Sequence, residues 1–201
     1  MKLYSFSALL ARMKYITRWS LMHSSRPESL SEHTADTALL AHTLCLISTN
    51  LFGTPESEVR PEKVTVAALY HDAPEILTGD LPTPVKYKSQ RMQAAYKALE
   101  KESEEEMLGL LPPELRSDIG KYLQGTVLTE KERQLLKAAD RLSALIKCLE
   151  EGHSGNREFD AALNEQRYAL HGMHCAEAEY FVQHMLPCYT LNLDELTHIE
   201  P

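Results

Sequence analysis

The sequence predicts an all-α fold, a helical bundle. Apolar residues recur with the helical period along almost the whole chain, and the alternation typical of strands is weak everywhere. Short breaks fall where proline, glycine and serine gather, and we find no internal repeat or long linker. The chain has 201 residues, of which 43% are hydrophobic, which is enough for one well-buried core. We therefore expect a single domain over residues 1–201.

Three helices are expected in the first part of the chain. An amphipathic stretch covers residues 6–16, and after a loop we expect a second helix to begin at Ser31, a good N-cap residue, and to run to residue 47. His33 would then stand in the first turn of that helix. A third helix is expected over about residues 62–71, and Pro74 prevents its smooth continuation.

Residues 75–84 are expected to form a loop, because they are punctuated by glycine and proline. A long charged helix follows over about residues 89–110, and a shorter one from Pro112 to about residue 123. The remaining segments, about residues 156–185, predict one or two further helices before a polar tail.

The helix that follows residue 129 has the clearest start signal. Thr129 and Glu132 match the S/T-x-x-E pattern, in which two side chains cap the first turn of a helix reciprocally. The helix places Asp140 between apolar neighbours, where a carboxylate needs a partner.

Composition narrows the classes of function. The formal net charge of −8 argues against a nucleic-acid polymer as the main partner, since such binders cluster lysine and arginine. No window approaches the roughly 18 uncharged apolar residues of a membrane span, and the N-terminus does not resemble a secretion signal. The four cysteines include no C-x-x-C pair and indicate reduced core thiols. We expect a cytoplasmic protein without a membrane anchor.

Four residues from three expected helices are candidate metal ligands: His33, His71, Asp72 and Asp140. Alone, a histidine in a first helical turn is more often a cap or a surface residue, but the two histidines and two acids lie in apolar settings. Two imidazole nitrogens and two carboxylate oxygens suit a first-row ion such as Mn²⁺, Fe²⁺, Co²⁺, Ni²⁺ or Zn²⁺ better than Ca²⁺. The expected fold is thus a helical bundle with a metal site in its core, and open positions on that metal would suit hydrolysis.

Other chemical signals are weaker. His171, His174 and Cys175 are spaced to share one helix face and could bind Zn²⁺, but no fourth ligand lies nearby in the sequence. The chain contains no P-loop, no dinucleotide-binding G-x-G-x-x-G and no G-x-S-x-G motif.

The order of these ligands resembles the HD-domain superfamily of metal-dependent phosphohydrolases. Four stretches are similar to the bacterial 5′-deoxynucleotidases of the YfbR type: Arg18-Trp19, RPESLSEH (26–33), HDAPEILTGDLPTP (71–84) and KAAD (137–140). The similarity extends over nearly the whole chain, and the stretch 71–84 is far more specific than the His-Asp pair alone.

The resemblance implies an all-helical enzyme, commonly a homodimer, that removes phosphate from deoxyribonucleoside 5′-monophosphates. It implies that His33, His71, Asp72 and Asp140 hold one divalent transition metal ion per chain, of which Co, Mn, Fe, Ni, Cu and Zn are candidates. His33 and Asp140 would also contact the substrate.

The same resemblance implies roles for residues outside the metal set. Glu75 would be the catalytic acid/base and Arg18 would orient the phosphate, which suits its fork of donors. The sugar would be met by Trp19 and Asp80, and the site would be lined by Leu81, Pro82 and Thr83. Pro74 fixes the backbone immediately before Glu75, and the sequence does not decide whether this changes how far the Glu75 carboxylate reaches.

Two other classes stay open at this point. One is a different HD-type phosphohydrolase, such as a phosphodiesterase or a nucleotide triphosphohydrolase. The short chain and the absence of extra basic residues for a polyphosphate argue against it. The other is a non-catalytic regulator that binds a nucleotide, and the intact Glu75 beside a complete metal set argues against that.

Overall fold

Helices account for the regular structure of this chain. The computed structural model describes residues 2–198, and within them we find helices, turns and one isolated antiparallel bridge between Thr17 and Ser29, with no strand. The predicted all-α fold is confirmed. Among the same residues, no helix is both long and apolar enough to cross a membrane. The single domain over residues 1–201 stays a prediction, and its ends lie outside the described range.

The α-helices, in chain order, are α1 (Phe6–Leu10), α2 (Leu30–Leu46), α3 (Pro61–Tyr70), α4 (Glu75–Thr78), α5 (Thr83–Lys86), α6 (Gln90–Gly109), α7 (Pro113–Leu123), α8 (Glu130–His153), α9 (Asp160–His171), α10 (Ala176–His184) and α11 (Leu193–Thr197). Short 3₁₀-helices cover Ala11–Tyr15, Arg157–Phe159 and Leu186–Thr190, and one π-helical turn, Ile47–Leu51, extends α2.

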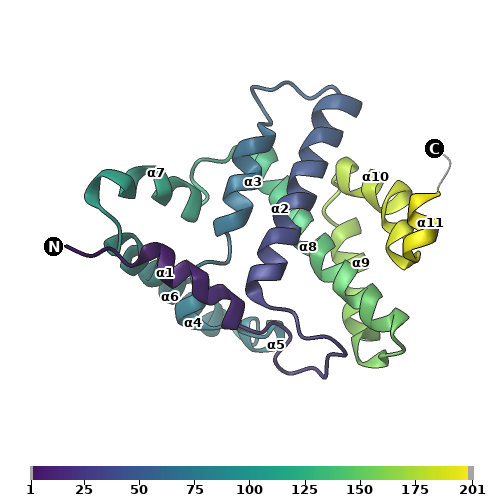
Figure 1. Ribbon diagram of the computed structural model, residues 1–201, viewed down its shortest axis with the longest axis horizontal. Helices are drawn as coiled ribbons and strands as arrows, with labels where there is room; N and C mark the ends of the chain where they lie inside the picture. The colour runs from purple at the N-terminus through teal and green to yellow at the C-terminus, as the bar shows by residue number, and fades with distance from the viewer. Residues whose placement is uncertain (1, 199–201) are drawn as a thin grey trace.

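Three helices, α2, α3 and α8, form the centre of the fold. α2 packs against α3 and α8, and α8 also contacts α9 and α10. In Figure 1, α2 and α3 stand near the middle, α8 passes behind them, α9 to α11 lie on one side, and α1, α4, α6 and α7 lie on the other. The main core cluster fills the centre and the C-terminal side, with fully buried residues such as Leu44, Val64, Leu135 and Leu142.

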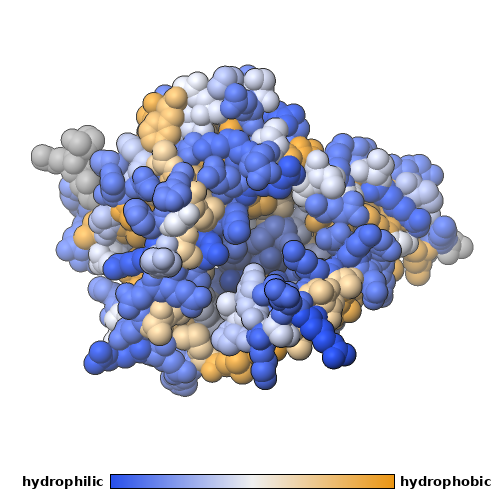
Figure 2. Space-filling view, turned by 180° about the vertical axis from the view of Figure 1, so that it is seen from behind, coloured by the Kyte–Doolittle hydropathy of each residue, from blue (hydrophilic) through white to orange (hydrophobic). Residues whose placement is uncertain are grey.

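A second, smaller cluster lies on the N-terminal side and holds the turn that follows α3. Phe6, Ala73, Met107, Leu111 and Leu123 are buried together there. Because Ala73 is a member, the neighbouring His71-Asp72 pair is anchored to this cluster. The face opposite to that of Figure 1 is hollowed near its middle, and the floor of this hollow is hydrophilic (Figure 2).

Helix α2 begins two residues earlier than predicted. Its N-cap is Ser29, whereas Ser31 already lies within the helix. The Ser29 hydroxyl accepts a hydrogen bond from the backbone N–H of Glu32, and the Glu32 carboxylate accepts from the backbone N–H of Ser29. This reciprocal capping box stabilises the earlier start, because it satisfies two free donors of the first turn. His33 still lies in the first turn, as predicted.

Several other boundaries differ from the predictions. Residues 75–84 contain the single-turn helix α4 and the start of a second one, α5, and α4 ends at Gly79, which has a positive φ of 76°. The stretch 6–16 is α-helical only to Leu10 and then tightens into a 3₁₀-helix, and the expected polar tail contains α11. The long helix at 89–110, the one after Pro112 and the Thr129–Glu132 capping box are confirmed.

Candidate metal centre

The capping of α2 places the His33 ring inside the protein. His33 is fully buried, with an exposure of 0%. Its Nδ1 lies 3.0 Å from the hydroxyl of Ser143 on α8, and a hydroxyl can either donate to that nitrogen or accept from it. This contact orients the ring so that Nε2 points away from Ser143.

His71 and Asp72 lie in consecutive turns between α3 and α4. The N–H of Ala73 donates to the carbonyl of Tyr70, and the N–H of Glu75 donates to the carbonyl of Asp72. The Nδ1 of His71 lies 2.7 Å from the carbonyl oxygen of Ala68. A carbonyl can only accept, so Nδ1 carries the proton, and Nε2 of the neutral ring has a free lone pair.

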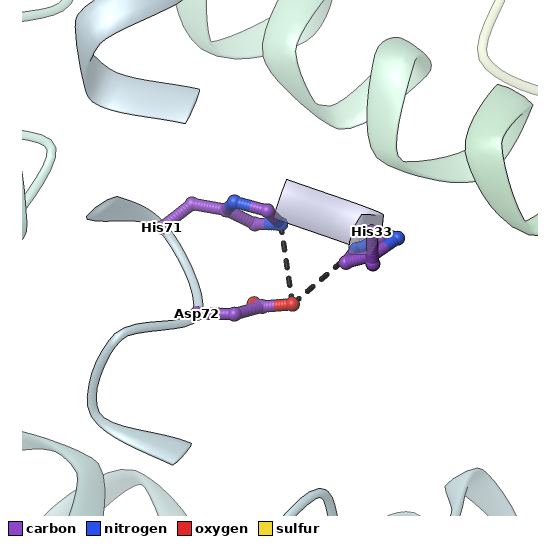
Figure 3. Close-up of side chains that lie close together, drawn as sticks. All are labelled: His33, His71 and Asp72. Atoms are coloured by element: carbon purple, nitrogen blue, oxygen red, sulfur yellow. Dashed lines mark ion pairs between the residues drawn. The ribbon is translucent and has the colours of Figure 1, made fainter. Parts of the chain in front are cut away.

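The three side chains converge on one point. Oδ2 of Asp72 lies 3.2 Å from Nε2 of His71 and 3.4 Å from Nε2 of His33. In Figure 3 the two rings approach the same carboxylate oxygen from different sides. One ligand atom from each of these three residues lies within 4.8 Å of the others, a spacing that fits a shared metal ion.

Asp140 lies beside this cluster on α8. Its Oδ1 is 3.2 Å from Nε2 of His33, and its side chain is 41% exposed. The predicted apolar surroundings therefore hold for its helix neighbours, while the carboxylate itself turns toward the histidines and solvent. The structure thus brings all four predicted ligands together, with His33, His71 and Asp72 forming the tight group.

The electrostatics of the site favour a bound cation. Burial opposes a charged imidazole, yet Asp72 and Asp140 raise the pKa of His71 to about 9. Burial also opposes charge on Asp72, but the two histidines hold the pKa of that carboxyl well below its ordinary value. Positive charge on or beside the two histidine rings is therefore strongly preferred. In the metal-free protein, protons on these rings supply that positive charge.

The donor atoms also fit a metal ion. Nε2 of His33 and Nε2 of His71 are buried and have no hydrogen-bond partner of good geometry among the described residues. In the neutral tautomer of His71, a lone pair faces a carboxylate oxygen, and two acceptors repel each other unless a cation lies between them. A divalent ion bound by imidazole and carboxylate resolves this conflict.

Arg18 reaches the site from a short backbone ladder, and Trp19 follows it in the chain. The N–H of Arg18 donates to the carbonyl of Glu28, and the N–H of Leu30 donates to the carbonyl of Ile16. The Nη1 of Arg18 lies 3.4 Å from Oδ2 of Asp72. Burial opposes the charge of Arg18, but the neighbouring carboxylates, Asp72 first among them, raise its pKa further. Arg18 is therefore a fixed cation at the edge of the candidate site.

Glu75 is the first residue of α4 and is 8% exposed. Pro74 precedes it as the N-cap and turns the chain so that the carboxyl is tucked into the protein. Burial, with the charges of Asp72 and Asp80, raises the pKa of Glu75 to about 9. Its Oε2 is buried without a hydrogen-bond partner among the described residues. Such a carboxyl keeps its proton at neutral pH, which is the state of a general acid.

In the segment after α4, Asp80 lies near enough to the site for its charge to act on both Glu75 and Arg18. Leu81 and Pro82 are partly buried and Thr83 is exposed. No hydrogen bond joins the side chains of these three residues to either histidine in the described structure, and their predicted lining role stays a prediction.

The weaker metal candidate is not supported. α9 ends at His171, His174 follows with a positive φ of 49°, and Cys175 is the N-cap of α10. The three side chains therefore do not share one helix face. Cys175 is buried and donates to the Glu177 carboxylate, and these three residues do not form a metal-type cluster in the described structure.

Two residues at the site were missed by sequence reasoning. Ser143 contacts Nδ1 of His33, and Glu28 contacts both Arg18 and Trp19. Ser143 lies three residues after Asp140, on the same side of α8. This spacing is the sequence signal that could have identified Ser143 as a residue of the site. Glu28 lies within the stretch 26–33 whose sequence was already notable.

A family model described as "5′-deoxynucleotidase YfbR-like" matches residues 5–189. The chain is 42% identical over 196 residues to a 5′-deoxynucleotidase of Cronobacter sakazakii, covering 98% of this chain and 97% of that one. It is 39% identical over 201 residues to 5′-deoxynucleotidase YfbR of Escherichia coli, covering all of both chains. This chain belongs to the YfbR-like 5′-deoxynucleotidase family.

Solved structures support the fold of this YfbR-like protein. An HD-domain phosphohydrolase from Listeria innocua superimposes with a TM-score of 0.77 at 22% identity, covering 96% of this chain and 95% of that one. The HD phosphohydrolase DatZ of cyanophage S-2L, solved with dA and one catalytic Zn²⁺ ion, gives a TM-score of 0.60 at 20% identity, covering 92% and 95%. The predicted HD-domain helical bundle is confirmed.

Proposed function

We propose that this YfbR-like protein is a metal-dependent 5′-deoxynucleotidase, which hydrolyses deoxyribonucleoside 5′-monophosphates to deoxyribonucleosides and phosphate. The observation that carries the proposal is the convergence of His33, His71 and Asp72 on one point, with Arg18 fixed beside Asp72. Relatives named 5′-deoxynucleotidases, about 40% identical over the whole chain, support the same activity.

The metal would be held by His33, His71, Asp72 and Asp140. When bound, a divalent ion supplies Lewis-acid polarisation of a phosphoryl oxygen and makes water more acidic. The mixed nitrogen and oxygen donors support Co, Mn, Fe, Ni, Cu or Zn rather than Ca²⁺ or Mg²⁺. Zinc bound to the structural neighbour DatZ agrees with this class of ion.

Arg18 would bind and orient the phosphate. Its side chain is 13% exposed and is held between Glu28 and Asp72, so its position is fixed before substrate arrives. A guanidinium offers parallel N–H donors that match phosphate oxygens. Its contact with Asp72 also places this cation next to the proposed metal, where the substrate phosphate must lie.

Glu75 would transfer protons. Its pKa of about 9 means that it carries a proton at neutral pH in the metal-free protein. Departure of the nucleoside 5′-oxygen requires a proton, and a protonated carboxyl beside the phosphate can donate it. The attacking water loses one proton in the same turnover, and the carboxylate left by the donation can accept it, so that Glu75 ends each turnover protonated.

The sugar side would be formed by Trp19 and Asp80, with Leu81, Pro82 and Thr83 lining the entrance. The indole of Trp19 packs on Phe159, with ring centroids 5.2 Å apart, and so presents a fixed wall. A wall that offers no hydrogen-bond partner rejects a ribose 2′-hydroxyl, because that group would lose its solvation. Asp80 can accept a hydrogen bond from a sugar hydroxyl.

We also propose that the protein acts in the cytoplasm as a homodimer, on free nucleotides and not on nucleic-acid polymers. The net charge of −8 supports small substrates over polymers. Gel filtration with light scattering tests the dimer.

A substrate panel tests the activity. Metal-stripped protein is supplied with each divalent ion in turn, and phosphate release is measured from deoxyribo- and ribonucleoside 5′-monophosphates, 3′-monophosphates, triphosphates and a phosphodiester. The proposal expects good turnover of deoxyribonucleoside 5′-monophosphates, little dependence on the base, and weak turnover of the others. Preferred cleavage of a triphosphate or diester would favour another HD-type hydrolase, and binding without any turnover would favour a regulator.

A further inference from the structure

Glu28 is the one described side chain that contacts Arg18, Trp19 and the surroundings of His33 together. Its Oε2 accepts a hydrogen bond of 2.8 Å from the indole N–H of Trp19 and lies 3.5 Å from Nε of Arg18. Its Oε1 lies 3.9 Å from Nδ1 of His33. We infer that Glu28 is a positioning residue that sets sugar selectivity by fixing the indole of Trp19, an inference that rests on the proposed function.

The backbone at Trp19 explains why such a fixing contact is needed. Trp19 has a φ of 60°, in the left-handed region that bulky residues rarely adopt. Such a conformation persists only where neighbouring contacts enforce it. The hydrogen bond to Glu28 and the edge contact with the buried Phe159 hold the indole from two sides.

Glu28 is itself held in place. Its carbonyl accepts from the N–H of Arg18, and its side chain is only 11% exposed. The preceding loop is attached to α8, because the N–H of Ser25 donates to Glu151 and the ammonium of Lys147 donates to the carbonyl of Arg26. The carboxylate of Glu28 is therefore a fixed acceptor.

One carboxylate thus connects the phosphate side of the proposed pocket to its sugar side. Nε of Arg18 faces Glu28, while Nη1 faces Asp72. Loss of the Trp19 contact frees the indole to move, and a mobile wall excludes a 2′-hydroxyl less well. Loss of charge alone removes the ion pair with Arg18 but leaves an oxygen that can accept from the indole.

Two substitutions at Glu28 separate these effects. Glu28→Ala removes the acceptor, and the ratio of kcat/KM for deoxyribo- over ribonucleotides should fall roughly tenfold, the effect of one lost hydrogen bond to a charged group. Glu28→Gln keeps an acceptor for the indole, so it should retain the wild-type ratio while kcat/KM falls for both sugars alike.

Trp19 provides a second readout that does not depend on activity. It is the only tryptophan in the chain, so fluorescence excited at a wavelength that tyrosine does not absorb reports on this indole alone. Acrylamide should quench the Glu28→Ala variant more strongly than the wild type, whereas Glu28→Gln should behave like the wild type. Glu177→Gln is the matched control, since Glu177 is a buried, lysine-paired carboxylate away from the site. Its melting temperature should fall without a change in quenching or selectivity.

Trp19→Phe covers the case in which Glu28→Ala folds poorly. It keeps an aromatic ring but removes the indole N–H that donates to Glu28, so the ratio of kcat/KM for deoxyribo- over ribonucleotides should fall as expected for loss of the Glu28 acceptor. Wild-type selectivity or wild-type quenching in a folded Glu28→Ala protein, or full selectivity in Trp19→Phe, would overturn the inference. Absence of phosphate release from the wild type would instead refute the proposed function, while quenching would still test the Glu28 contact.

Discussion

Nε2 of His71 lies 3.2 Å from Oδ2 of Asp72, the residue that follows it in the chain. Side chains of adjacent residues rarely face one point, and here they do so because the backbone turns sharply between α3 and α4. Because Nδ1 of His71 is hydrogen-bonded to a carbonyl, Nε2 of the neutral ring would be an acceptor directed at another acceptor. This pairing makes the site dependent on a cation.

Replacement of a predicted ligand should remove the metal. His71→Ala, Asp72→Ala and Asp140→Ala are each expected to lower metal content and phosphate release more than about tenfold, because each removes a donor from one ion. Metal is measured by elemental analysis of purified protein. His171→Ala is the control and should match the wild type. A fully loaded Asp140→Ala protein would show that Asp140 is a neighbour and not a ligand.

Removal of the metal should destabilise the protein. An ion that binds only the folded state stabilises that state by mass action. At a free ion concentration one hundred times the Kd, the stabilisation is about 2.7 kcal/mol. Treatment with a chelator should therefore lower the melting temperature, and re-addition of the ion should restore it. The His71→Ala variant should melt at the same temperature with or without the ion. If the chelator leaves the melting temperature of the wild type unchanged, the proposed metal site is contradicted.

Ser143 should tune metal affinity without touching the metal. Its hydroxyl lies 3.0 Å from Nδ1 of His33, and it is 4% exposed. Ser143→Ala is expected to weaken metal binding about 10- to 100-fold, the usual effect of losing a partner of a ligating histidine. Titration with the metal measures this affinity, and turnover at saturating metal should stay near that of the wild type. The equally buried Ser103 on α6 supplies the control Ser103→Ala.

Glu75→Gln should separate chemistry from metal binding. The variant should keep its metal, while turnover falls by the roughly 10²- to 10⁴-fold typical of a lost general acid or base. Loss of the metal would instead identify Glu75 as a ligand, and wild-type turnover would assign the proton transfer to another group, with Asp80 the next to test.

The same variant carries a pH signature in the metal-free protein. The pKa of Glu75 is raised from 4.5 to about 9, so the folded state retains a proton that the unfolded state has lost between these values. Wild-type stability should therefore decline relative to Glu75→Gln as the pH rises from about 5 toward 9. The difference in melting temperature between the wild type and Glu75→Gln is measured at pH 5 and at pH 8.5. An equal difference at both pH values contradicts the raised pKa of Glu75.

The anchor at Glu151 should be sensitive to acid. Burial opposes the charge of Glu151, but the paired ammonium of Lys147, the N–H of Ser25 and the side-chain amide of Asn156 hold the pKa of this carboxyl well below its ordinary 4.5. The stabilisation is complete above pH 4.5 and is lost as the pH falls toward the depressed value. Glu151→Gln should lower the free energy of unfolding by about 3 kcal/mol at pH 7, since it leaves a buried lysine unpaired. In urea unfolding, the difference in free energy between the wild type and Glu151→Gln should be smaller at pH 3.5 than at pH 7. The control Glu158→Gln, at an exposed position, should not differ from the wild type.

Features decided by near neighbours were predictable from the sequence. The capping box of Thr129 and Glu132 begins helix α8. The box and the helix depend on hydrogen bonds between residues three or four positions apart, so the local sequence determines them. Where two local signals competed, the prediction was wrong by two residues, because Ser29 has Glu32 at the capping spacing and Ser31 does not. The four metal ligands stay a prediction, which the sequence alone permits because chemistry restricts the residue types that can hold such an ion.

Contacts between distant segments were decided by the tertiary structure alone. The pairing of His33 with Ser143 joins residues 110 positions apart, and no local pattern encodes it. The same holds for the contact of Trp19 with Phe159 and for the exposure of Asp140, which sits on an apolar stripe yet turns its carboxylate to the site. Helical period and capping specify each element by itself, whereas the packing of α2 against α8 determines which side chains meet and therefore which groups orient the site.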